Sequence, residues 1–347
     1  MKSRGIRMQI ILGILAVIFL VVLPIVTMAI YNGEFGKRYE VREYAAYKPE
    51  DFPNLELQRC ELISNKGDKL AAYKYQKKGI VPKAVLVMVH GLCGSHRNYL
   101  DLCDYFAGHG YTIFTYDATG NGESEGKKVG GFAQGLADLD YVLRFVKSQK
   151  EYKGLQILLM GHSWGGYCVG SILKFHPDVT AVVNISGFDS VPGILKQYAE
   201  MHIGKAATLL MPYVSIYERI RWGKYSGICA CEGFANSDAK VMIIHSSDDK
   251  TVLTENGYGL FKEKFDNDKR FVFKMYTDRA HSYPVNSDKA RKIRTEVKND
   301  YIKRLKTQGE AEAQKYIETE VDRRQWMELD EGLMQEILVM FDNAIEK

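Results

Sequence analysis

The sequence predicts an α/β fold organised around a mostly parallel, doubly wound sheet. From about residue 61 onward, strand-like segments alternate with helical patterns, which is the order required by a parallel sheet with helices on both faces. Most of the later strand-like segments are short continuous apolar runs, as expected for strands buried on both faces. A composition of 46% hydrophobic and 26% charged residues is ordinary for a globular core with a solvated surface.

The individual elements follow from these periodicities. The expected strands cover residues 70–75, 84–89, 112–116, 156–160, 181–185, 241–245 and 271–276. The expected helices between them cover residues 99–107, 131–148, 166–176 and 254–265. The apolar spacing over residues 331–345 predicts a terminal helix that packs one face on the sheet.

Two segments interrupt this alternation. Residues 191–240 contain no clear strand and are rich in Tyr, Met, Leu and Ile, which predicts a helical insertion. Residues 286–325 are heavily charged and lack proline, so we expect exposed helix there, with no assigned function. A length of 347 residues allows one large domain or two small ones. We expect a single domain at 61–347. A polar, Tyr-rich lead-in at 31–60 precedes it and connects it to an apolar N-terminal segment.

The membrane assignment concerns residues 8–30, which contain no charged side chain. At about 1.5 Å of rise per residue this segment spans roughly 34 Å, enough to cross a bilayer core. Lys2, Arg4 and Arg7 precede it, and the charges that follow it balance. The positive-inside rule therefore predicts a single-pass anchor with residues 1–7 in the cytoplasm and the main domain outside. A cleaved signal peptide, which would give a secreted protein, is the alternative.

Charge and cysteine content exclude several classes of function. The net charge is +4, and the three basic residues before the apolar segment supply most of it. The remainder is close to neutral, so we expect no nucleic-acid partner. The six cysteines show no disulfide or zinc spacing, although their even number leaves disulfides open. No metal and no organic cofactor are expected.

The pattern Gly161-His162-Ser163-Trp164-Gly165 matches the G-x-S-x-G nucleophile elbow. An apolar strand is expected before it and a helix after it. Small residues two positions before and after the serine let strand and helix approach closely, and the sharp turn lifts the hydroxyl above the sheet. The helix N-terminus favours developing negative charge. The alternative is a glycine-rich turn with an incidental serine.

A nucleophilic serine needs a base, and the base needs an acid that orients it. In this type of site the chain order is serine, acid, histidine. His281 follows the last expected strand on a loop, where the base belongs. The other histidines after Ser163 fit less well, because they lie at a surface helix end, in the insertion and at a strand end: His176, His202 and His245.

The acid is expected directly after the strand at 241–245. The segment HSSDDKTV offers Asp248 and Asp249, of which we prefer Asp249, with Val252 three residues on. Either aspartate could instead form only an Asx turn. Asp189, at the end of the preceding strand, is a weaker candidate.

Acyl transfer also needs two backbone N–H donors that stabilise the oxyanion. Trp164, directly after the serine, would supply one. The loop after strand 84–89 would supply the other from Leu92, because His90 and Gly91 precede it and the glycine allows a tight turn. The alternative is that this His-Gly pair merely ends the strand.

Five motifs in this order resemble those of a known family: HGLCGS at 90–95, YDATGNGESEG at 116–126, GHSWGG at 161–166, HSSDDKTV at 245–252 and AHS at 280–282. Over roughly residues 61–285 the chain resembles α/β-hydrolase-fold serine hydrolases of the monoacylglycerol lipase, lysophospholipase and serine aminopeptidase-like type. The resemblance implies a triad of Ser163, Asp249 and His281. It also implies a structural turn at Asp117 and Gly122, and a cap formed by the insertion at 191–240.

Two departures from the family pattern stand out. Ser246 lies where the acid loop commonly has glycine, which keeps Asp248 open as an alternative to Asp249. The charged segment at 286–325 is longer than the family usually carries.

The sequence therefore predicts a hydrolase of carboxylic esters that works through an acyl-enzyme. The apolar cap and the membrane anchor favour a lipid-like small-molecule ester, either a monoacylglycerol or a lysophospholipid. The first alternative is an aminopeptidase-type enzyme, which would need a cap carboxylate such as Glu200, Glu218 or Glu232 to bind the substrate amine. The second is a non-catalytic membrane-anchored binding protein, which the intact set of catalytic motifs disfavours.

Overall fold

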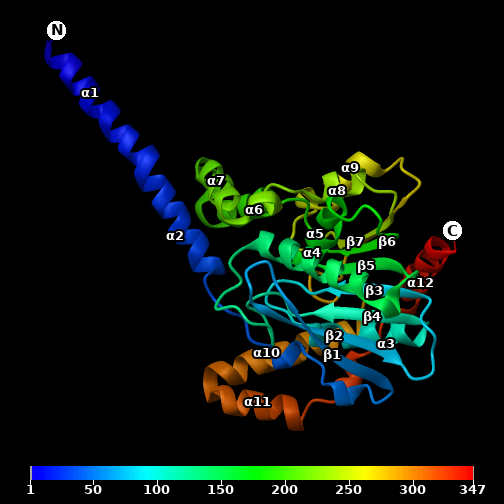
Figure 1. Ribbon diagram of the computed structural model, residues 1–347. Coiled ribbons are helices and arrows are strands. Elements are labelled where there is room, and N and C mark those ends of the chain that lie inside the picture. The colour runs from blue at the N-terminus through cyan, green and yellow to red at the C-terminus, as the bar shows by residue number, and fades with distance from the viewer. Residues whose placement is uncertain (1, 347) are drawn as a thin grey trace.

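The computed structural model describes residues 2–346 and contains one eight-stranded sheet between two layers of helices (Figure 1). The strand order is β1-β2-β4-β3-β5-β6-β7-β8, and every pair from β4 to β8 is parallel. The strands are β1 (Leu55–Ile63), β2 (Lys69–Lys77), β3 (Ala84–Val89), β4 (Tyr111–Tyr116), β5 (Gln156–His162), β6 (Ala181–Ile185), β7 (Lys240–Ser246) and β8 (Phe271–Tyr276). The predicted α/β fold with a mostly parallel sheet is confirmed.

Two hydrophobic cores lie on the two faces of the sheet. The helices that contribute to the first core include α4 (Phe132–Ser148), α5 (Trp164–Ser171), α8 (Ala230–Ala235) and α9 (Tyr258–Phe265). The helices of the second are α3 (Leu100–Gly108), α10 (Asp288–Gln308), α11 (Glu310–Thr319) and α12 (Glu331–Ile345). Strands β3 and β4 are buried along their whole length, which explains their continuous apolar sequences.

Strand β1 differs from the sequence expectation. It begins at Leu55, inside the segment treated as a lead-in, and pairs antiparallel with β2 along its whole length. Most of its side chains are exposed, so it is an edge strand without the apolar run that marks the central strands. The folded domain therefore begins before residue 61.

The insertion at 191–240 is helical. It contains α6 (Val191–Ile203), a 3-10 segment at Gly204–Leu209, α7 (Met211–Trp222) and α8. In Figure 1, α6 and α7 stand apart from the sheet, beside the lower end of the N-terminal helix. We call α6, α7 and the 3-10 segment between them the cap.

The charged segment at 286–325 is helical, but the expectation that it is exposed is wrong for its inner face. Arg294 of α10 is only 2% exposed. Its guanidinium donates a hydrogen bond to the Tyr47 hydroxyl and lies 3.6 Å from the buried Asp101 carboxylate. Asn286 donates to the same carboxylate. A buried ion pair thus fixes α10 under the sheet, and sequence periodicity shows nothing of this pairing.

The N-terminus forms one continuous helix from α1 (Lys2–Val17) through a π-helical turn at Ile18–Val22 to α2 (Leu23–Phe35). The helical stretch Ile6–Phe35 contains an 18-residue window with a mean hydropathy of 3.1, and it is long and apolar enough to cross a membrane. The helix projects away from the domain, and only its last turns contact the rest of the chain (Figure 1).

Burial of α12 against the sheet makes a stability prediction. Phe341 is fully buried and packs near the rings of Phe106 and Tyr111. Phe341→Ala should lower the free energy of unfolding by about 3–5 kcal/mol, because it opens a cavity in the core. Val339 on the same helix is 45% exposed, so Val339→Ala should change it by less than about 0.5 kcal/mol. Urea unfolding of the detergent-solubilised chain measures both, and equal losses would contradict this packing.

Candidate active site

Ser163 occupies a strained turn between β5 and α5. Its φ of 58° and ψ of −117° lie where non-glycine residues are rarely found. A Cβ at Gly161 would lie 2.3 Å from the Gly165 carbonyl oxygen, and a Cβ at Gly165 would lie 2.1 Å from the Val89 carbonyl oxygen. Only glycine fits at both positions, so strand β5, helix α5 and the end of β3 can meet around the serine.

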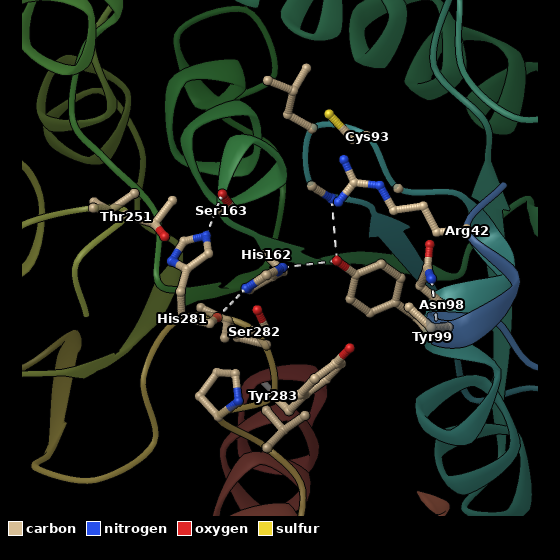
Figure 2. Close-up of a pocket in the computed structure, with 18 of the residues that line it drawn as sticks. Arg42, Cys93, Asn98, Tyr99, His162, Ser163, Thr251, His281, Ser282 and Tyr283 are labelled. Atoms are coloured by element: carbon tan, nitrogen blue, oxygen red, sulfur yellow. Dashed lines mark hydrogen bonds between the residues drawn. The ribbon is translucent and has the colours of Figure 1, made fainter. Parts of the chain in front are cut away.

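The structure brings Ser163, His281 and Asp249 together, and Figure 2 shows the first two of them. The Ser163 Oγ lies 2.8 Å from His281 Nε2, and His281 Nδ1 lies 2.7 Å from an Asp249 carboxylate oxygen. His281 lies after β8 and Asp249 after β7, on neighbouring parallel strands. Since the carboxylate only accepts, Nδ1 carries the proton and Nε2 is free to accept from the serine hydroxyl.

Asp249 is held in its ionised form. Burial alone would raise the pKa of its carboxyl, but the hydrogen bond and charge of His281 outweigh this. The backbone N–H groups of Thr251 and Val252 also donate to the carboxylate, at 2.8 and 3.0 Å. Together these contacts hold the pKa of Asp249 below its ordinary value.

The alternative acids have other partners. Asp248 accepts from the Ser246 hydroxyl and from the Ala280 N–H, and Ser246 in turn accepts from the Arg279 N–H. Ser246 and Asp248 therefore tie the acid loop to the loop that carries the histidine. Asp189 is buried and accepts from the Cys231 N–H.

Three other histidines follow Ser163, and none of them contacts it in the described structure. His245 is buried, with Nε2 at 3.0 Å from the Val252 carbonyl oxygen. His202 is exposed on the cap. The expectation of a surface position for His176 is wrong, because it is buried with Nε2 2.8 Å from an Asp140 carboxylate oxygen.

The two expected oxyanion donors lie on either side of the serine. Trp164 is the first residue of α5, and its indole is buried, with Nε1 donating to the Phe132 carbonyl. A Cβ at Gly91 would lie 3.3 Å from the Ser163 Cβ, so the loop that carries Leu92 passes directly beside Ser163. Their backbone N–H groups have no hydrogen-bond acceptor within the part of the chain described.

The side chain of His90 stabilises the loop that carries Leu92. It is buried, and its Nδ1 donates to the Gly91 carbonyl oxygen at 2.7 Å while Nε2 accepts from the Ala118 N–H at 2.9 Å. Burial lowers the pKa of His90, which favours this neutral, doubly bonded imidazole. Asp117 and Gly122 form the turn beyond it: the Asp117 carboxylate accepts backbone N–H groups, and Gly122 has a φ of 50°.

The site includes two further residues, His162 and Tyr99, that the sequence analysis did not predict. His162 donates from Nε2 to the His281 carbonyl oxygen at 2.7 Å and accepts at Nδ1 from the Tyr99 hydroxyl at 2.9 Å. The Tyr99 oxygen also accepts the Gly91 N–H at 3.2 Å. Desolvation is the main cause that lowers the pKa of His162 to about 3, and the charge of the nearby His281 lowers it further. This imidazole therefore stays neutral. The chain of bonds links the oxyanion loop to the histidine loop (Figure 2).

His162 stood inside the elbow motif and could have been found there, whereas nothing in the sequence marks Tyr99. A pocket of about 360 Å³ opens over these residues. Its described lining contains one acidic side chain, Asp101, which is paired with Arg294. The described residues contain no cluster of His, Cys, Asp or Glu able to hold a metal ion.

Solved structures share this architecture. An esterase from Pyrococcus furiosus aligns with a TM-score of 0.55 at 17% identity, covering 78% of this chain and 98% of that one. Est1E from Butyrivibrio proteoclasticus, solved with ferulic acid, aligns with a TM-score of 0.52 at 18% identity, covering 70% and 97%. The chain has the α/β-hydrolase fold.

Sequence comparison finds relatives for part of the chain. Residues 81–223 match the family described as serine aminopeptidase, S33. Human monoglyceride lipase is 36% identical over 96 residues, which are 27% of this chain and 31% of that protein. A monoglyceride lipase homologue of monkeypox virus is 32% identical over 92 residues, 26% of this chain and 33% of that protein. The chain thus matches about a third of the length of these curated relatives, and the predicted resemblance to this group of hydrolases is confirmed.

The contacts of Tyr99 generate a prediction about the site. Tyr99→Phe removes the hydroxyl that donates to His162 and accepts from Gly91. Losing two hydrogen bonds should slow phosphonylation of Ser163 by a fluorophosphonate about tenfold. Tyr105→Phe, on the neighbouring helix α3, is the matched control and should leave the rate unchanged. An unaltered rate in Tyr99→Phe would show that the linkage does not position the site.

Proposed function

We propose that this α/β-hydrolase cleaves carboxylic esters, with Ser163 as nucleophile, His281 as general base and Asp249 as the acid that orients the base. The observation that carries the proposal is the continuous hydrogen-bond chain from Ser163 through His281 to Asp249 at a pocket wall. Both distances lie within the range expected of a nucleophile, its base and the orienting acid.

The reaction proceeds in two halves. His281 Nε2 takes the Ser163 hydroxyl proton while the oxygen attacks the ester carbonyl carbon. The C–O bond to the alcohol breaks, and the alcohol leaves with the proton from His281. Water then attacks the acyl-enzyme, losing a proton to His281, and the acid departs as Ser163 regains its proton. Throughout, the Asp249 carboxylate holds the histidine in one tautomer and stabilises its transient positive charge.

The negative charge that develops on the carbonyl oxygen is assigned to the backbone N–H groups of Leu92 and Trp164. Such preorganised donors contribute about 2.7–4 kcal/mol each in comparable sites. His90 and Gly91 serve this hole by setting the course of the loop, and Gly161 and Gly165 serve it by permitting the elbow. No metal and no organic cofactor takes part in the proposed steps.

The proposed substrates are lipid-like esters, either monoacylglycerols or lysophospholipids. Two observations support this class: the relatives include monoglyceride lipases, and a largely apolar cavity adjoins the catalytic pocket. A single-pass anchor at 8–30, with the N-terminus cytoplasmic and the catalytic domain outside, would present the site to lipid. Cleavage of that segment as a signal, giving a secreted enzyme, is the alternative topology.

Aminopeptidase activity is the second candidate, and the matched family's name favours it. It would need a carboxylate in the pocket to bind an amine, but none of the three candidates lines the pocket, neither the two on the cap nor Glu232 on α8. Glu218 accepts from the Tyr31 hydroxyl, Glu232 pairs with Lys174 at 2.8 Å, and Glu200 lies beside Lys196. These contacts favour ester over peptide substrates, and the assembled triad disfavours a purely binding role.

The nucleophile is tested with a fluorophosphonate probe. Intact protein should be labelled once per chain, and Ser163→Ala should not be labelled, because the probe reacts with an activated serine. Ser171→Ala is a matched control. Ser171 is buried in α5, the helix that begins directly after Ser163, and it has no assigned role. Equal labelling of wild type and Ser163→Ala would refute the serine mechanism.

The acid is tested by a pair of isosteric variants. Asp249→Asn should lower kcat for p-nitrophenyl butyrate by about 10⁴-fold, because an amide favours the wrong histidine tautomer. Asp248→Asn should cost less than about tenfold, since it disturbs only the contacts between the two loops. Steady-state kinetics distinguish the two, and the reverse ranking would transfer the role to Asp248.

The type of bond that the protein cleaves, ester or amide, is tested by comparing the hydrolysis of p-nitrophenyl esters with that of aminoacyl anilides. Hydrolysis of the esters and little turnover of the anilides is the expected result. Faster turnover of anilides with a free amine would favour the peptidase instead.

A further inference from the structure

A second cavity of about 600 Å³ lies between the end of the N-terminal helix and the cap. We call it the chamber. Leu92, Phe132 and Tyr198 line both the chamber and the catalytic pocket, so the two are adjacent compartments. The volume is that of a typical ligand site. Its lining is mainly apolar, including Ile30, Phe35, Leu195, Ile203, Met211 and Val214.

One wall of the chamber belongs to the helix that is long enough to cross a membrane. Thr27, Tyr31 and Phe35 are buried at four-residue intervals, which places them on one face of α2. The Tyr31 hydroxyl donates to the Glu218 carboxylate of α7 at 2.5 Å, and its ring packs edge-on against Tyr217. The end of the helix is therefore docked on the cap, and it does more than tether the domain.

The docked helix also connects with the nucleophile elbow. The Phe35 ring packs edge-on against Phe132, with 4.9 Å between centroids. The Phe132 carbonyl oxygen accepts a hydrogen bond from Trp164 Nε1 at 2.8 Å, and Trp164 directly follows Ser163. The wall of the chamber and the nucleophile are thus joined by direct packing.

The cap carries exposed apolar side chains as well. Five of them are 49% to 78% exposed: Met201, Ile203, Leu209, Ile216 and Ile220. With the exposed length of the N-terminal helix, which the cap adjoins in Figure 1, they form a surface suited to the membrane interface. The chamber therefore lies where the proposed anchor would leave the bilayer.

We propose that the chamber holds the acyl chain of the ester and that the N-terminal helix is a determinant of acyl-chain length. This inference rests on the proposed function. With the carbonyl at Ser163, the chain passes the Leu92 and Phe132 side chains into the chamber. Each methylene buried there contributes roughly fourfold to kcat/KM. An apolar occupant suits this lining, because a polar one would lose its hydrogen bonds to water.

The test fills the chamber from two opposite walls in the full-length chain, in detergent micelles. Ile30→Trp acts from the N-terminal helix and Ala199→Trp from α6, since both positions line the chamber. Ile25→Trp is the matched control, because Ile25 lies on the same helix, is 60% exposed and is absent from the lining. The kcat/KM values for p-nitrophenyl laurate and butyrate are compared.

Wild type and Ile25→Trp should prefer laurate. Ile30→Trp and Ala199→Trp should lose at least about tenfold of that preference while butyrate hydrolysis stays within about twofold, since only the long chain needs the chamber. An unchanged preference in both, or an equal loss for both esters, would overturn the inference. Titration with fluorophosphonate counts the folded sites of each variant, and if one variant fails to fold, the other decides.

The two levels of proposal fail in different ways. A wild-type chain that is neither labelled at Ser163 nor active on butyrate would refute the proposed function itself. A wild-type chain that hydrolyses both esters, with variants that both keep its preference for laurate, would refute the chamber and the N-terminal helix as the acyl-chain site and leave the proposed function standing.

Discussion

The close approach of three backbone segments around Ser163 is the constraint on which the rest of the site depends. The turn holds a strained serine backbone, and such strain persists only where the surroundings enforce it. Here the Ser163 N–H donates to the Ile185 carbonyl oxygen of β6 at 2.8 Å, and α5 starts at the next residue. Any side chain at Gly161 or Gly165 would collide with backbone oxygen, so the glycines are a condition for the turn to exist.

The parallel sheet then determines where the partners of the serine lie. Strands β3, β5, β7 and β8 all run in one direction, so the loops that follow them emerge at the same edge. Those loops carry Leu92, Ser163, Asp249 and His281, which lie far apart in the sequence. The bonds of His162 and Tyr99 add a connection between the first and the last of these loops.

The sequence was sufficient for features that repeat or occupy a fixed place in the chain. Buried parallel strands are recognised by their apolar runs. The residues of the proposed triad follow their strands in the chain order serine, acid, histidine. Strand β1 was missed because an exposed edge strand has no such run. The burial of Arg294 and of His176 was missed because each depends on one carboxylate from a distant helix, Asp101 or Asp140. Pairings between charged or polar side chains that lie far apart in the sequence do not change the local pattern of apolar residues, so this pattern cannot predict them.

The N-terminal helix shows the same limit in a different form. A segment suited to lipid is apolar all round, so a face that packs on protein cannot be told from one that faces lipid. The signal lies in the polar atoms at its end, where Tyr31 and Asn32 bond to Glu218 and Tyr217 of the cap. Hydrogen-bonding groups at the end of an apolar helix need partners, and here the cap supplies them. The contacts that fix the helix to the cap thereby connect the proposed membrane anchor, through Phe132 and Trp164, with Ser163.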